Sequence, residues 1–72
     1  MEIRLDGKKL IRARFALGMS QSDLAKAAGV NATTIFNWEA GKPCAAASKA
    51  KKICDVLGLD VADVILFAED AS

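Results

Sequence analysis

The chain has 72 residues and a net charge of +1, a length that suits one domain with one small core. Hydrophobic residues make up 53% of it, aromatic residues only 6%, and there is one proline, which favours helices over sheet. The absence of histidine excludes Ser–His and Cys–His catalysis and histidine metal sites. No stretch could span a bilayer, and residues 1–10 lack the apolar core of a secretory signal. We expect a cytoplasmic protein that is not an enzyme and needs no cofactor, metal or membrane.

The charges are divided unevenly along the chain. Residues 1–52 carry all ten basic side chains and a net charge of +6, whereas residues 53–72 carry five acidic side chains and no basic one. The first part suits a polyanion and the second would repel it, although a merely uneven solvated surface is an alternative. The two cysteines, Cys44 and Cys54, are too few for a disulfide framework or a zinc site, and we expect reduced thiols.

Five short helices are predicted, and a glycine follows most of them. The second helix begins with a capping box, because Ser20 at the N-cap precedes Asp23 at the third helical position. Asn31 and Asp60 are the N-caps expected for the third and fifth helices. The expected ranges are 7–17, 21–28, 32–40, 46–57 and 60–68.

Two charged residues lie on faces that are otherwise apolar. Arg14 shares the inward face of the first helix with Leu10, and Glu39 shares that of the third helix with Ile35 and Trp38. A buried charge without a partner costs several kcal/mol. The sequence therefore predicts that Arg14 and Glu39 pair with each other.

The spacing of small and apolar residues between 21 and 39 predicts two helices that cross steeply through a tight turn. Ala25 is small enough for the two backbones to meet, and Gly29 supplies the positive φ that the turn requires. Val30, Ile35 and Trp38 fill the angle between the helices. Because several positions must agree, this pattern is more specific than a single motif.

Residues 10–66, about four-fifths of the chain, resemble the Cro/CI-type (XRE) helix-turn-helix domain of phage repressors and small bacterial regulators. The resemblance implies an all-α, five-helix, lambda-repressor-like fold that usually dimerises and places its third helix in the DNA major groove. It also implies the Arg14–Glu39 bridge between the first and third helices. The matching residues, in the family's order and spacing, are Leu10, Ile11, Arg14, Met19, Ser20, Gln21, Leu24, Ala25, Ala28, Gly29, Val30, Thr34, Ile35, Asn37, Trp38, Glu39, Gly41, Lys42, Pro43, Ile53, Leu57, Gly58 and Leu59.

Four residues are expected at DNA phosphates. The resemblance implies that Gln21, at the start of the second helix, binds a phosphate of the DNA backbone. The alternative is that Gln21 is an ordinary polar residue in the first turn of a helix. Asn31 and Thr34 could each cap the third helix or bind a DNA phosphate. Lys42 follows the third helix, where the chain is expected to return toward the DNA backbone.

Base readout is expected from Ala32, Thr33, Phe36 and Asn37 on the outward side of the third helix. Asn37 can pair with adenine through two hydrogen bonds, and the Thr33 methyl can meet a thymine methyl. Phe36 departs from the family, where a small polar residue is common. It has three interpretations: a contact with thymine methyls or sugar, a core residue over the first or fourth helix, or part of a protein interface.

The run from Val64 to Phe67 is too apolar for one helix to bury on one face. With Val64 and Ile65 in the core, Leu66 and Phe67 would face outward and suggest a partner. The sequence predicts a twofold dimer through the C-terminal helix, about 60–68.

These observations predict a sequence-specific regulator of transcription that binds double-stranded DNA, in the form of a small dimeric repressor reading a near-palindromic operator. The alternative is a protein-interaction module on the same fold, an antitoxin subunit or bridging cofactor that binds a protein through its C-terminal helix. A steep salt dependence of duplex binding would distinguish the first from the second.

Overall fold

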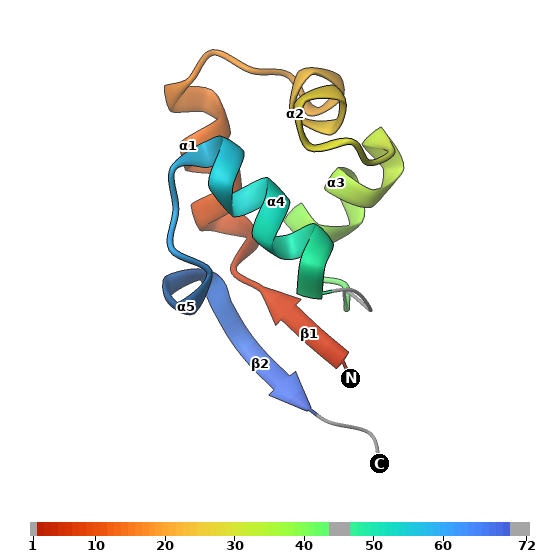
Figure 1. The fold of residues 1–72 in the computed structure, drawn as a ribbon, viewed down its shortest axis with the longest axis vertical. Helices are drawn as coiled ribbons and strands as arrows, with labels where there is room; N and C mark the ends of the chain where they lie inside the picture. The colour runs from red at the N-terminus through yellow and green to blue at the C-terminus, as the bar shows by residue number, and fades with distance from the viewer. Residues whose placement is uncertain (1, 44–46, 70–72) are drawn as a thin grey trace.

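The computed structural model describes residues 2–43 and 47–69. The helices pack into one body, and two antiparallel strands form a ribbon that extends from one end of it (Figure 1). The all-α, five-helix fold class is confirmed, with this small sheet in addition. The elements in chain order are β1 (Glu2–Leu5), α1 (Gly7–Ala16), α2 (Gln21–Ala28), α3 (Ala32–Glu39), α4 (Ala47–Leu57), α5 (Val61–Val64) and β2 (Ile65–Glu69).

The core draws apolar side chains from every helix and from β1. Leu10, Leu24, Ile35, Ile53 and Val64 are each no more than 1% exposed. Burial of each such side chain contributes about 1.5–3 kcal/mol, which holds together helices that would be unstable alone. The periodicity predicted for α4 is confirmed, and its buried residues are Ala50, Ile53, Cys54 and Leu57.

The start of α2 has the predicted capping box. The Asp23 main-chain N–H donates to the Ser20 hydroxyl, and the Ser20 main-chain N–H donates to the Asp23 carboxylate, each at 3.0 Å. The backbone hydrogen bond from Ser20 is the main reason that the pKa of Asp23 lies below its ordinary 3.8. Gly29 ends the helix in the left-handed conformation, with φ 71°.

The predicted helix over 60–68 is wrong beyond Val64. Helix α5 ends there, because Ile65 is extended (φ −71°, ψ 118°) and the chain continues as β2. Strand β2 contains Ile65 and Phe67, which favour a strand, but also Leu66 and Ala68, which do not, so pairing rather than propensity decides its conformation. Its partner is β1, where Ile3 and Leu5 are buried on the core side, and this N-terminal strand was not predicted at all.

The pairing of β1 with β2 contains a bulge. Arg4 lies opposite Phe67 and Leu5 opposite Ile65, so Leu66 is the extra residue on β2. Leu66 is 66% exposed, whereas the side chain of Phe67 lies outside the described part of the structure. The ribbon is continuous with the helices, since the Asp6 main-chain N–H donates to the Val64 carbonyl at 2.7 Å.

The capping box predicts that replacing Asp23 destabilises the protein by an amount that depends on pH. Because the pKa of Asp23 is lowered from 3.8 by folding, its contribution is fully present above pH 3.8 and is lost as the pH falls through the folded-state value. Asp23→Asn should therefore lower the urea midpoint at neutral pH and have progressively less effect in acid. Unfolding followed by Trp38 fluorescence at several pH values measures this, with Ser22→Ala in the same exposed turn as control. If the urea midpoints of wild type and Asp23→Asn differed by the same amount at every pH, this prediction would be contradicted.

Candidate nucleic-acid interface

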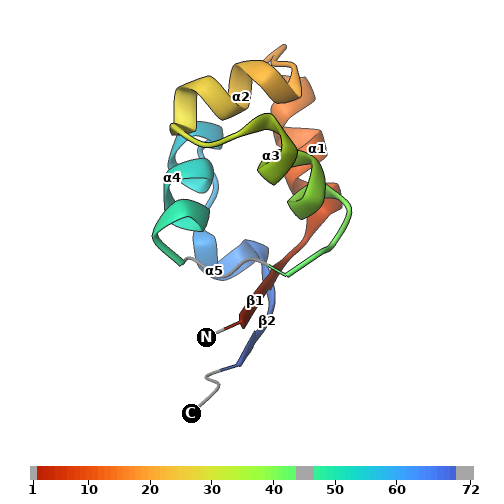
Figure 2. The ribbon, with the colours of Figure 1, turned by 90° about the vertical axis from the view of Figure 1, so that its right-hand side faces the viewer.

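Helices α2 and α3 lie across one another through the turn at 29–31 (Figure 2). The turn is closed by a hydrogen bond from the Val30 N–H to the Ala25 carbonyl at 2.9 Å. Ala25 and Ala28 are 4% and 5% exposed, so the buried side of α2 includes small side chains, and α2 packs against α3. These contacts give α3 a defined orientation relative to α2.

Helix α3 is anchored on one side and open on the other. Ile35 and Trp38 are 1% and 5% exposed and belong to the core. Of the residues expected to read bases, Thr33 is exposed and Asn37 is half-buried, one helical turn beyond it. Ala32 is also exposed, at the first helical position. The structure therefore distributes these candidates along a fixed helix, with Ala32 and Thr33 in its first turn and Asn37 in its last.

Phe36 is 56% exposed, on the side of α3 away from the core. The interpretation of Phe36 as a core residue over α1 or α4 is therefore wrong. The interpretations as a DNA contact or as part of a protein interface are both compatible with an exposed aromatic ring.

The residues expected at phosphates surround this helix pair. Asn31 and Lys42 are exposed just before and just after α3, while Gln21 and Thr34 are half-buried. Asn31 occupies the N-cap position of α3 without a side-chain cap bond. The Lys42 main-chain N–H donates to the Asn37 carbonyl at 3.0 Å, which directs the chain back past the end of α3.

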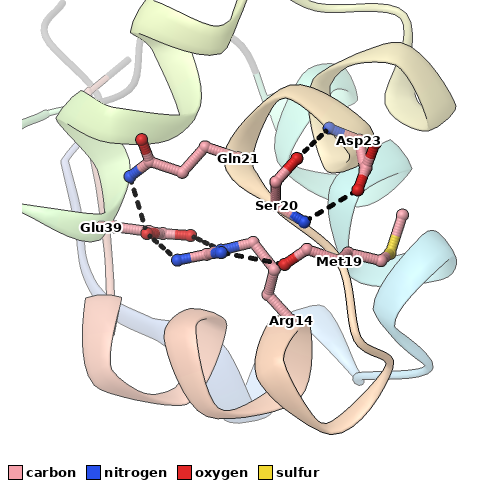
Figure 3. Close-up of polar contacts among 6 residues, drawn as sticks. All are labelled: Arg14, Met19, Ser20, Gln21, Asp23 and Glu39. Carbon is pink, nitrogen blue, oxygen red and sulfur yellow. Dashed lines mark hydrogen bonds and ion pairs between the residues drawn. The ribbon is translucent and has the colours of Figure 1, made fainter.

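Arg14 and Glu39 form the predicted pair between α1 and α3 (Figure 3). Arg14 Nε donates to Glu39 Oε2 at 2.7 Å and its Nη2 to Oε1 at 3.1 Å, a bidentate arrangement. The two side chains are 8% and 5% exposed, so water scarcely screens the interaction. The pair therefore fixes where α3 ends relative to α1.

The guanidinium has two further contacts that keep it in place. Its Nη1 donates to the Met19 carbonyl at 2.9 Å, in the connection between α1 and α2. Its central carbon lies 4.7 Å from the centroid of the Phe15 ring, within range of a cation–π interaction. Arg14 thus ties the start of the helix-turn-helix unit, as well as its end, to α1.

Gln21 joins the same cluster, which the sequence pattern did not predict. Its side-chain Nε2 donates to Glu39 Oε1 at 3.1 Å, so one carboxylate receives both Arg14 and Gln21 (Figure 3). This bond links the first residue of α2 to the last residue of α3. It orients the Gln21 amide and leaves the amide oxygen and the second N–H hydrogen outside this bond.

Gly7 is a second residue that the sequence pattern did not identify. It is buried at the first position of α1 and lies against the backbone of Glu39. A glycine where a helix begins, without a turn that needs positive φ, is the only signal that the sequence offered.

Helix α4 carries both basic and acidic groups on its exposed surface. Lys49 and Lys52 are exposed on α4, and Lys51 forms an ion pair with Asp55 at 2.8 Å. The hydrogen bond to Asp55 raises the pKa of Lys51. The remaining acidic side chains of this region that are described, Asp60 and Asp63, are exposed at α5.

The structure offers no evident metal site within residues 2–43 and 47–69, where no group of three or more potential ligands comes together. Burial raises the pKa of the Cys54 thiol, which is therefore protonated at neutral pH, and Cys44 lies outside the described residues. None of the described helices is long and apolar enough to cross a membrane.

Comparison with known proteins identifies the family. A helix-turn-helix family model matches residues 9–64. The chain belongs to this helix-turn-helix family. The predicted resemblance to XRE-type domains is thereby confirmed, and membership makes the protein a DNA-binding transcriptional regulator.

A solved structure shares the fold. The restriction-modification controller protein C.AhdI from Aeromonas hydrophila is similar with a TM-score of 0.70 and 24% sequence identity, over 79% of this chain and 86% of that one. No curated protein sequence matches the chain.

Removal of Glu39 should be strongly destabilising. Glu39→Ala leaves the buried Arg14 without its partner, which should cost about 3–5 kcal/mol in the free energy of unfolding. The double variant Arg14→Met/Glu39→Leu should lose much less, because apolar residues of similar volume often replace a buried pair without cost. Urea unfolding measures both.

The exposed pair between Lys51 and Asp55 provides the control for this experiment. Asp55→Ala should change the unfolding midpoint little, because the two side chains are 60–65% exposed and solvent screens them. Equal effects of Glu39→Ala and Asp55→Ala would contradict the structural importance of the buried pair.

Proposed function

We propose that the protein is a sequence-specific repressor that places α3 in the major groove of double-stranded DNA. The observation that carries this proposal is the fixed orientation of α3. Its core side is anchored by Ile35 and Trp38, and its last residue, Glu39, is bonded to α1 and α2. Its opposite side offers Thr33, Phe36 and Asn37 to a groove that admits a helix.

Base readout is assigned to Ala32, Thr33, Phe36 and Asn37. The Asn37 amide suits the N6 and N7 atoms of adenine, and the Thr33 hydroxyl suits several bases. Ala32 and the methyl group of Thr33 suit a thymine methyl, and the exposed ring of Phe36 extends this apolar surface. We therefore expect an operator with adenine and thymine at the contacted positions.

Phosphate contacts are assigned to Gln21, Asn31, Thr34 and Lys42, which surround the starts of α2 and α3 and the end of α3. Helix N-termini favour phosphate oxygens, because their first N–H groups and the helix dipole point outward. The bond from Gln21 to Glu39 would hold the amide ready for a phosphate rather than leave it free to rotate. Such contacts position the protein but do not select a sequence.

A second copy of the chain is the expected partner at the C-terminal end, through Leu66 and Phe67. Leu66 is 66% exposed on a bulge, and β2 pairs with β1 alone among the described strands. Since this segment is a strand, a twofold contact would join strand edges rather than helices. Such a dimer would present two α3 helices to a near-palindrome and repress by occupying the promoter.

Titration of a random-sequence duplex pool at several salt concentrations tests the proposed function. We expect fluorescence anisotropy to show affinity that falls steeply with salt, and selection of the bound fraction to enrich a near-palindrome. Absence of binding at low salt would contradict the proposal and favour a protein-interaction module, an antitoxin subunit or bridging cofactor.

Two substitutions should distinguish contacts with DNA bases from contacts with DNA phosphates. Asn37→Ala should relax one position of the selected site, with a loss of about 1–3 kcal/mol in discrimination there. Lys42→Ala should weaken all duplexes about equally and leave the base preferences unchanged, because its exposed side chain lies outside the cluster that orients α3. Selection with each variant measures both effects, and a Lys42→Ala variant with altered base preference would contradict the assignment of Lys42 to a phosphate.

Leu66→Asp should weaken self-association. The substitution places a charge in the proposed contact, so sedimentation should show a shift toward monomer at a given concentration. Leu17→Asp is the matched control, because Leu17 is 54% exposed at the end of α1, outside the proposed contact. A wild-type chain that stayed monomeric at high micromolar concentration, or equal effects of the two substitutions, would contradict the proposed dimer contact.

A further inference from the structure

Position 7 requires glycine because there is no room for a side chain, and not because of its backbone conformation. The glycines with positive φ are Gly18, Gly29, Gly41 and Gly58, and Gly7 is not among them. A Cβ atom added at Gly7 would lie 2.7 Å from the carbonyl carbon of Glu39, 3.0 Å from its Cα and closer still to its oxygen. These are backbone atoms, which cannot rotate away as a flexible side chain would.

Helix α1 holds Glu39 at two points. Its buried residues are Gly7, Leu10 and Arg14, which form one stripe along the helix. Gly7 meets the backbone of Glu39, and Arg14, seven residues later, bonds its carboxylate. Seven residues are about 10.5 Å along a helix, and helical side chains lean toward the N-terminus, so Arg14 reaches back toward Gly7.

The start of α1 is also bonded to the C-terminal segment. The Asp6 main-chain N–H donates to the Val64 carbonyl at 2.7 Å, and Lys9 Nζ donates to the Asp63 carbonyl at 2.8 Å. Strand β1, directly before α1, is paired with β2. These bonds resist displacement of the N-terminal end of α1 away from Glu39.

We propose that Gly7 is a positioning residue for base recognition, an inference that rests on the proposed function. Its missing side chain lets the C-terminal end of α3 sit directly on α1, and this contact sets the tilt at which α3 meets DNA. A methyl group there would push the Glu39 backbone outward. Breaking the buried bonds of the Glu39 carboxylate costs more than a small shift of backbone, so the helix end moves.

The consequence differs along α3. Asn37 lies two residues before Glu39, whereas Thr33 lies six residues before it. A tilt that starts at the C-terminal end therefore displaces Asn37 more than Thr33. Base contacts depend on position within a hydrogen-bond length, but phosphate attraction does not.

The test compares Gly7→Ala with Gly18→Ala. Gly18 has a φ of 68° and no atom within 4 Å of an added Cβ, so alanine there strains the backbone without touching α3. Both variants should lose stability, which Trp38 fluorescence during urea unfolding measures. For each variant, the ratio of affinities for the wild-type selected duplex and for a random duplex is measured at one salt concentration. This ratio does not depend on the folded fraction, and trimethylamine N-oxide is added to all samples where a variant is under half folded.

The expected result is a specificity ratio about tenfold lower for Gly7→Ala, greatest at the base position that Asn37→Ala relaxes, with the salt dependence unchanged. Gly18→Ala should keep the wild-type ratio. A Gly7→Ala variant with the wild-type ratio would overturn the positioning role and leave the proposed function intact. A wild-type chain that selects no site would overturn the proposed function and this inference together.

Discussion

The structure depends on the buried carboxylate of Glu39. A desolvated charge must be paired and hydrogen-bonded, and this one receives Arg14 from α1 and Gln21 from α2 while it belongs to α3. Three helices are therefore joined at a single residue. Because the interaction is directional, it specifies one arrangement where apolar packing would accept several.

The surface proposed for DNA follows from this constraint. With Glu39 fixed and Ile35 and Trp38 in the core, the remaining side of α3 must face outward. Helix α2 packs against α3 closely enough for Gln21 to reach the same carboxylate. Rigid support of this kind is what base recognition needs, because hydrogen bonds to base edges tolerate little displacement.

The C-terminal segment shows how one end of the chain supports the other. Residues 65–69 pair with β1, and the Val64 carbonyl accepts from Asp6 immediately before Gly7. The C-terminal strand is thus joined to the residue next to Gly7, where α1 meets the backbone of Glu39. The strand leaves Leu66 exposed at a bulge, where a helix would have presented a different set of side chains.

The sequence by itself determined the helices up to residue 57, the tight turn at Gly29 and the pairing of Arg14 with Glu39. These features are local or follow from charge: capping residues and helical periodicity act within a few positions, and a charge on an apolar face requires a partner. Only the tertiary structure decided the form of residues 65–69, the bond from Gln21 and the role of Gly7. A short apolar run is equally compatible with helix and strand until β1 lies beside it, and a glycine needed for close approach is recognised only when the opposing backbone is in place.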